Sequence, residues 1–230
     1  MEDELRVISE ASLRRLPRYL HFLKQLAGQG QTAVSCPQIA REFKLDPTQI
    51  RKDLAATGIA GRAKVGYDTA ELIDAVEEFL GWKNVNDAFL AGAGSLGSAL
   101  LGYAHFQDQG LNIVAVFDND PDKIGREIHG REILPLEKLP ELAQRMNVHI
   151  GVIAVPASAA QDVATLMVLG GVVAVWNFAP APLDVPENVI VENAQLSTSL
   201  GVLTSKLKRA FQWSRRLGTS SHAHSDGPQI

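Results

Sequence analysis

Residues 87–97 read Asp87-Ala88-Phe89-Leu90-Ala91-Gly92-Ala93-Gly94-Ser95-Leu96-Gly97, a short apolar segment followed by a GxGxxG motif. The segment 87–91 predicts a β-strand, and the motif opens a predicted helix over 95–105. In a dinucleotide-binding unit the first glycine permits a tight turn, the second lets the backbone approach the pyrophosphate, and the third allows close helix–strand packing. The helix N-terminus offers N–H donors and a positive dipole to the phosphates. The predicted dinucleotide-binding residues here are Gly92, Ala93, Gly94, Ser95, Leu96 and Gly97.

An acidic residue follows at the spacing that such a motif requires. Asp118 ends the predicted strand 112–117 and lies 21 residues after Gly97. The fingerprint expects an acid about 20 residues on, where it accepts hydrogen bonds from the ribose hydroxyls. A carboxylate there repels a 2′-phosphate, so the sequence favours NAD(H) over NADP(H). Val155 and Pro156 end a later strand at the carboxyl edge, where they either contact the nicotinamide or only terminate the strand.

Apolar, β-rich segments alternate with helical stretches from residue 84 onward. The segments are 88–90, 113–117, 150–155 and 172–176. This alternation predicts an α/β fold with a parallel sheet, a Rossmann dinucleotide-binding domain over 84–195. A glycine turn that has lost its ligand, or that binds coenzyme A, remains an alternative interpretation.

The N-terminal residues, 1–80, predict a separate helical domain. A leucine stripe from Leu13 to Leu26 predicts an amphipathic helix, which the glycines of 27–30 end. Short helices are predicted over 35–43, with Ser35 as N-cap, and over 48–56. Their lengths and short connection are typical of a helix-turn-helix. The segment 58–67 predicts a basic β-hairpin, the wing of a winged helix-turn-helix domain.

Positive charge is concentrated in this N-terminal domain. The chain has a net charge of −4, yet residues 5–67 hold eleven Lys or Arg and four Asp or Glu, a net +7. A basic segment on an acidic protein is typical of a domain that contacts phosphates, although a solvated basic face or a protein-interaction module fits too. Arginine and lysine suit guanine, glutamine suits adenine, and lysine also suits phosphate. The predicted DNA-binding residues are Ser35, Gln49, Arg51, Lys52, Arg62 and Lys64.

Several classes of protein are disfavoured by composition. A hydrophobic content of 46% supports packed cores rather than disorder, and Cys36 is the only cysteine, which excludes an internal disulfide and a cysteine-built zinc site. No apolar run approaches the roughly 18–20 residues of a membrane helix, and the N-terminus does not resemble a secretory signal. We therefore expect a cytoplasmic protein that has no metal site and does not contact a membrane.

Catalytic residues are not evident in the sequence. A dehydrogenase needs an acid–base group, usually His or Lys held by a carboxylate. His105, His129 and His149 fall in helix-end, loop and strand contexts that do not suggest such a pair. We predict no catalytic residues and no enzymatic activity. A small NAD-dependent dehydrogenase whose N-terminal helices mediate dimerisation remains the alternative.

Over about residues 12–216 the chain resembles the Rex family of redox-sensing transcriptional repressors. The resemblance rests on residues 12–19, 50–54, 92–97, 117–118, 123–125, 155–157 and 177–180. It implies a homodimer that exchanges its C-terminal helix, 196–216, binds a palindromic operator, and is released by NADH, with NAD⁺ competing in the DNA-bound form. Lys123 joins the expected cofactor-binding residues, and 217–230 is expected to be a disordered tail.

Two positions depart from the pattern of that family. Ala56 and Thr57 stand where aromatic residues usually precede the wing glycine, which bears on the operator sequence. Gln195 aligns with an aspartate thought to form a state-dependent ion pair with an arginine of the partner's DNA-binding domain. That substitution bears on the strength of the switch between the two states.

Overall fold

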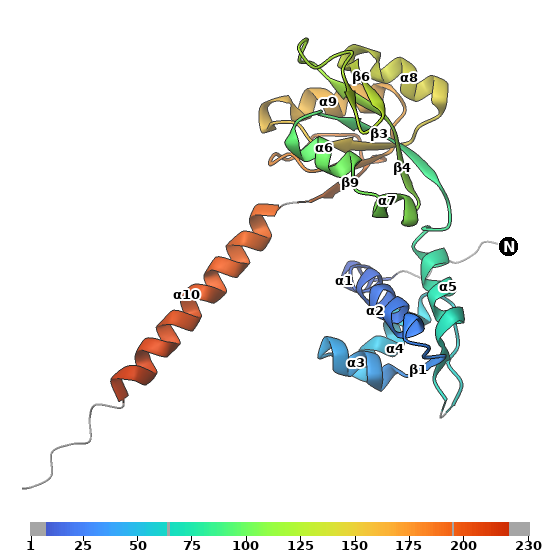
Figure 1. The fold of residues 1–230 in the computed structure, drawn as a ribbon, viewed down its shortest axis with the longest axis vertical. Coiled ribbons are helices and arrows are strands. Elements are labelled where there is room, and N and C mark those ends of the chain that lie inside the picture. The colour runs from blue at the N-terminus through green and yellow to red at the C-terminus, as the bar shows by residue number, and fades with distance from the viewer. Residues whose placement is uncertain (1–7, 64, 195, 221–230) are drawn as a thin grey trace, which may run out of the picture. The chain divides into compact units, whose positions relative to one another are not determined.

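The computed structural model describes residues 8–63, 65–194 and 196–220 (Figure 1). The chain divides into two compact units, one formed by Met1–Val85 and His105–Leu111 and the other by Asn86–Ala104 and Asn112–Ile230. Within the described ranges, no helix is long and apolar enough to span a membrane.

The first unit is a small helical domain with one short antiparallel sheet. Its elements are α1 (Glu10–Leu13), α2 (Leu16–Gly28), β1 (Ala33–Val34), α3 (Cys36–Phe43), α4 (Pro47–Ala55), β2 (Tyr67–Asp68), α5 (Thr69–Phe79) and the one-turn α7 (His105–Asp108). Its core consists of fully buried side chains from these helices: Leu16, Tyr19, Leu20, Leu23, Ile39, Ile50, Leu54, Leu72 and Val76.

The predicted first helix is interrupted between α1 and α2. Pro17 lies in the first turn of α2, a position that proline tolerates because a first-turn N–H has no partner within the helix. Leu13 lies before the break and is 41% exposed, whereas the later leucines of the stripe are buried. The helix ends at Gly28, and Gly30 adopts a positive φ of 81°, as the glycine cap predicted.

The helix-turn-helix is confirmed as α3 and α4. Ser35 caps α3 by accepting the N–H of Gln38, and Asp46 caps α4 by accepting the N–H of Thr48 at 2.6 Å. Helix α4 begins and ends one residue earlier than the predicted 48–56. The turn between the helices closes at Lys44, which has a left-handed φ of 53°.

The wing is shorter than the predicted hairpin over 58–67. Arg62 and Gly66 exchange two backbone hydrogen bonds, of 2.6 and 2.9 Å, in an isolated bridge. The chain then enters β2, which pairs with β1 rather than with residues of the wing. Gly66 has a φ of 94°, and a Cβ there would overlap the backbone carbonyl of Val34, so this position requires glycine. Lys64 lies outside the described residues.

The second unit contains a seven-stranded sheet. Its strands are β3 (Asn86–Ala91), β4 (Leu111–Asp118), β5 (Glu127–Ile128), β6 (Arg131–Pro135), β7 (Ile150–Ile153), β8 (Ala174–Asn177) and β9 (Ile190–Asn193). Their order is β5-β6-β4-β3-β7-β8-β9, and β5 is antiparallel to β6. From β3 the chain continues to β4 and β6 on one side of the sheet and then to β7, β8 and β9 on the other side. This reversal creates the switch point at which doubly wound sheets bind ligands.

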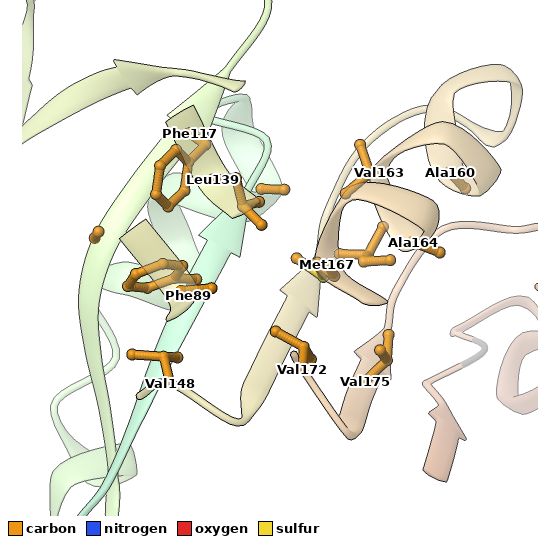
Figure 2. Close-up of a cluster of buried hydrophobic side chains, with 14 of the residues drawn as sticks. Phe89, Phe117, Leu139, Val148, Ala160, Val163, Ala164, Met167, Val172 and Val175 are labelled. Carbon is orange, nitrogen blue, oxygen red and sulfur yellow. The ribbon is translucent and has the colours of Figure 1, made fainter. Parts of the chain in front are cut away.

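The helices of this unit follow the strands of the sheet. They are α6 (Ser95–Leu101), α8 (Leu139–Met146), preceded by the short 3₁₀ helix η1 (Leu136–Lys138), α9 (Ala157–Leu169) and α10 (Leu196–Ser220). Side chains of α8 and α9 pack with strand residues in one buried cluster (Figure 2). In this cluster the rings of Phe89 and Phe117 lie 5.0 Å apart, joining β3 to β4.

Some predicted boundaries differ from the structure. The helix predicted over 95–105 ends at Leu101, with Gly102 as its cap, and α7 is a separate turn. The strand predicted over 150–155 ends at Ile153, and β8 begins two residues later than predicted. The C-terminal helix α10 (Leu196–Ser220) extends past residue 216 because Gly218 weakens a helix by only about 1 kcal/mol. Residues 221–230 of the expected tail lie outside the described residues.

Candidate dinucleotide-binding and DNA-binding sites

The glycine motif forms a tight loop between β3 and α6. Gly92 has a φ of 103°, and a Cβ there would overlap the carbonyl oxygen of Ala154. At Gly97 a Cβ would overlap the carbonyl oxygen of Gly92, so helix and strand approach as closely as the motif predicts. Gly94 caps α6, and no atom lies within 4 Å of a Cβ at this position. The packing of the protein therefore requires the first and third glycines, whereas the second faces open space.

Asp118 lies beside this loop, at the carboxyl end of β4. Its carboxylate is 7% exposed and accepts the N–H of Ala93 at 2.8 Å and that of Asp120 at 2.9 Å. Lys123 Nζ donates to the same carboxylate at 3.2 Å. Burial alone would raise the pKa of Asp118, but these three donors outweigh it and hold the pKa below its ordinary value. The carboxylate is therefore ionised and is held by donors of the protein itself.

Val155 and Pro156 lie close to the same loop. The N–H of Ala154 donates to the carbonyl of Ala91 at 2.8 Å, which places the residues after β7 next to the end of β3. The Val155 side chain lies 3.0 Å from the position of a Cβ at Gly92, and Pro156 precedes α9. Residues predicted from separate segments thus meet at the carboxyl edge where β4, β3 and β7 end.

Among the contacts of the described residues, none pairs a histidine of this unit with a carboxylate as an acid–base pair would require. His129 has a φ of 46° and lies 3.4 Å from Ser98 Oγ, beside Gly102. No group of three or more His, Cys, Asp or Glu side chains is placed to hold a metal ion among the described residues.

A cleft of about 650 Å³ separates α4 from the wing. Ser35, Arg51 and Arg62 line it, so three of the predicted DNA-binding residues converge on one surface. Arg62 is 71% exposed, with a long ion pair of 3.8 Å to Glu71, and the side chain of Ser35 is partly engaged as a helix cap. Lys52 is exposed but lines a different hollow, next to α1.

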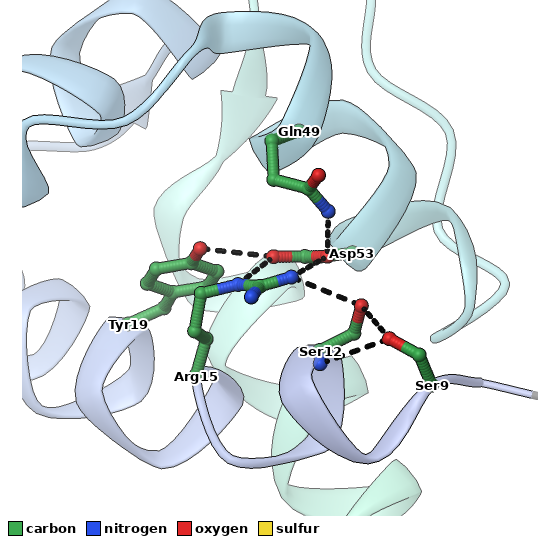
Figure 3. Close-up of polar contacts among 6 residues, drawn as sticks. All are labelled: Ser9, Ser12, Arg15, Tyr19, Gln49 and Asp53. Carbon is green, nitrogen blue, oxygen red and sulfur yellow. Dashed lines mark hydrogen bonds and ion pairs between the residues drawn. The ribbon is translucent and has the colours of Figure 1, made fainter.

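Gln49 differs from the other predicted DNA-binding residues in the described part of the chain because its side chain donates to a buried carboxylate. Its Nε2 donates to Asp53 Oδ1 at 2.8 Å (Figure 3). Asp53 also binds Arg15 and Tyr19, and none of these three was predicted as a functional residue. Ile50, Asp53 and Leu54 have the spacing of one buried helix face, so an acid among apolar positions was the signal in the sequence.

Two family models match parts of the chain. "CoA binding domain" matches residues 83–181, and "Putative DNA-binding protein N-terminus" matches residues 7–55.

Curated relatives and solved structures match most of the chain. The redox-sensing transcriptional repressor Rex of Carboxydothermus hydrogenoformans is 46% identical, over 88% of this chain and 97% of the relative. Rex of Bacteroides fragilis is 44% identical, over 87% of this chain and 91% of the relative. The crystal structure of RSP in complex with β-NAD⁺ and operator DNA has a TM-score of 0.85 at 32% identity, covering 92% of this chain and 98% of that chain. RSP in complex with β-NADH has a TM-score of 0.82, also at 32% identity, covering 91% and 98%. The chain therefore belongs to the Rex family of redox-sensing transcriptional repressors.

Proposed function

We propose that this protein represses transcription by binding a palindromic operator as a homodimer, and that NADH binding to the Rossmann domain releases the DNA. The observation that carries the proposal is the presence in one chain of two preformed sites. One is the glycine loop held by Asp118, and the other is the cleft between α4 and the wing, lined by Arg51 and Arg62. The complexes of RSP with operator DNA and with β-NADH support this pairing of ligands.

In the dinucleotide site we assign one part of the ligand to each group of residues. The loop 92–97 and the N-terminus of α6 bind the pyrophosphate, and Asp118 accepts the ribose hydroxyls. Val155 and Pro156 lie near the nicotinamide, and Lys123 holds the carboxylate of Asp118. The protein chain supplies binding and no acid–base chemistry, which is consistent with relatives that are repressors.

In the DNA site we assign base contacts to α4 and backbone contacts to its surroundings. Arg51 and Lys52 are exposed on α4, which enters the major groove as a recognition helix. Ser35, Arg62 and Lys64 contact the phosphates on either side. Two such helices in a dimer must match half-sites about 34–36 Å apart or a multiple of that distance. NADH then releases DNA only if it binds better to a conformation with a different separation.

The C-terminal helix supports a homodimer. Leu200, Leu203, Leu207 and Phe211 recur along α10, and each is at least 52% exposed. A stripe of this kind on a long helix is typical of an interface with another chain. We assign this stripe to the partner subunit and expect the exchanged helix that the family resemblance implies. Because operator DNA is its proposed ligand, we infer that the protein acts in the cytoplasm.

The test is selection of duplexes from a random DNA pool by the purified protein. Binding of the enriched duplex is then titrated with NADH, NAD⁺ and coenzyme A at fixed salt. We expect a palindrome that NADH releases and NAD⁺ tolerates. Enrichment of no sequence, with tight NADH binding retained, would favour the dehydrogenase alternative. Release by coenzyme A instead of NADH would favour the ligand named in the family model that matches residues 83–181.

A further inference from the structure

We propose that Asp53 is a positioning residue for operator recognition, and that Gln49 orients the recognition helix through Asp53 instead of reading a base. The inference rests on the proposed DNA-binding function and changes the role assigned to Gln49. It is carried by a partly buried hydrogen-bonded network, centred on the buried Asp53, that joins α4 to α1 and α2 (Figure 3).

The carboxylate of Asp53 is saturated with donors. Its side chain is fully buried, and Arg15 binds it with both arms, Nε to Oδ2 at 2.7 Å and Nη2 to Oδ1 at 2.8 Å. Tyr19 donates to Oδ2 at 2.9 Å, and Gln49 donates to Oδ1 at 2.8 Å. Each oxygen therefore accepts two hydrogen bonds, which uses the full acceptor capacity of a carboxylate. This geometry fixes the side chain of Asp53 in one orientation.

The network connects three helices. Tyr19 belongs to α2, Arg15 occupies the N-cap position of α2, and Arg15 also donates to Ser12 of α1 at 3.0 Å. Ser12 in turn bonds to Ser9, the N-cap of α1, at 2.8 Å. Because removing one member of a buried charged pair leaves the other uncompensated, the orientation of α4 depends on these contacts. The helices α1 and α2 thereby set the direction in which α4 presents its exposed residues.

The side-chain amide of the half-buried Gln49 is directed along its own helix toward Asp53. A glutamine that reads adenine presents Nε2 and Oε1 together to the base edge. Here Nε2 is directed at Asp53, which lies four residues further along the same helix. The side chain of Asp53 is fully buried. Arg51 and Lys52 lie between them in sequence and are exposed. We therefore assign base reading to Arg51 and Lys52, and helix orientation to Gln49 and Asp53.

The experiment compares Gln49→Ala, Asp53→Asn and the double variant in the full-length protein, with the duplex selected by the wild type as the probe. Binding is measured at a temperature well below the unfolding midpoint of each variant. The probes are the selected duplex, duplexes with single base-pair substitutions in one half-site, and an unrelated duplex. Glu77→Gln is the matched control, because it breaks the ion pair with Lys24 in the same domain without touching α4.

We expect Gln49→Ala to weaken operator binding about tenfold, the effect of losing a hydrogen bond to a charged group. The loss of preference should spread over the base pairs that α4 reads. In the double variant, Gln49→Ala should weaken operator binding little beyond the effect of Asp53→Asn, because the two residues act through one network. Affinity for the unrelated duplex and for NADH should remain at the wild-type level, as it should in Glu77→Gln.

Three outcomes would overturn the inference. One is that Gln49→Ala loses preference at a single base pair, which would show direct reading. Another is that its effect and that of Asp53→Asn add independently. The third is that operator and unrelated duplex weaken equally, which would indicate a role in stability alone. If Asp53→Asn does not fold, the base-pair scan of Gln49→Ala decides. If the wild type enriches no duplex, the proposed function itself fails, and this inference fails with it.

Discussion

The Oδ2 atom of Asp118 accepts the backbone N–H of Ala93 at 2.8 Å, which ties the acid at the end of β4 to the glycine loop at the end of β3. These residues are 25 positions apart in the sequence. Because both groups are fixed before a dinucleotide arrives, binding needs little further ordering of the protein. Substitutions at this junction should therefore change ligand affinity more than they change the fold.

Asp118→Ala should weaken NADH binding by about 1.5–3 kcal/mol, the range for hydrogen bonds to charged groups. The measurement is isothermal titration calorimetry with NADH. Asp87→Ala is the control, since that side chain bonds Asn112 at 2.8 Å between the same two strands but at their opposite end. Equal affinities in wild type and Asp118→Ala would show that the carboxylate does not contact the ribose.

The second glycine of the motif can be separated from the first and third by what a Cβ at each position would contact. Gly94→Ala should keep the unfolding temperature and weaken NADH binding, because its Cβ enters open space where we place the pyrophosphate. Gly97→Ala should lower the unfolding temperature, because its Cβ overlaps the carbonyl oxygen of Gly92. Thermal unfolding and NADH titration of both variants test this. Unchanged NADH affinity in Gly94→Ala would place the pyrophosphate elsewhere.

The geometry of the glycine loop follows from the sequence because the rules that govern it are local. Gly92, Gly97 and Asp118 follow from fixed spacings around a strand and a helix, and the structure brings them together. The network of Asp53 could not be predicted in this way, since its partner Arg15 lies 38 residues away. Strands β5, β6 and β9 were also missed. Strands β5 and β9 lie at the two edges of the sheet and β6 lies beside β5, and their pairing partners rather than the residue pattern define them.

Lys123 should govern the choice between NADH and NADPH together with Asp118. Its ammonium binds Asp118 at 3.2 Å and Asp120 at 3.4 Å, so its charge is neutralised in the protein as it stands. In Asp118→Ser the carboxylate that repels a 2′-phosphate is gone and Lys123 loses one acidic partner. We expect the preference for NADH over NADPH to fall. The double variant Asp118→Ser with Lys123→Met should gain less NADPH affinity than Asp118→Ser alone. An equal gain would show that Lys123 does not bind the 2′-phosphate.

Asp53 should make the stability of the N-terminal domain depend on acid pH. Burial raises the pKa of Asp53, but the hydrogen bonds from Arg15, Gln49 and Tyr19 outweigh burial and leave the pKa below its ordinary value. A depressed pKa in the folded state contributes stability that is present above the unfolded pKa, about 3.9, and is lost as pH falls through the folded pKa. The difference in unfolding free energy between wild type and Asp53→Asn should therefore be large at about pH 7 and shrink below about pH 4.

Denaturant unfolding at a series of pH values, followed by circular dichroism, measures that difference. The pKa of Asp118 is also lowered, so Asp118 adds to the pH dependence of the unfolding free energy. Its contribution is the same in wild type and Asp53→Asn and cancels in the difference between them. A difference that stays constant from neutral to acid pH would show that Asp53 contributes through shape and not through its charge.

The salt dependence of operator binding should separate base contacts from phosphate contacts. Arg62 is 71% exposed on the wing, where we assign it to a phosphate, so Arg62→Ala should reduce the slope of log K against log salt by about 1. It should weaken binding to all duplexes alike. Arg51→Ala should also lower discrimination among half-site variants, because arginine reads guanine in the major groove. Arg126→Ala removes an exposed charge from the Rossmann unit and should leave both quantities unchanged. Equal loss of discrimination in Arg62→Ala and Arg51→Ala would mean that the wing, and not α4 alone, reads the bases.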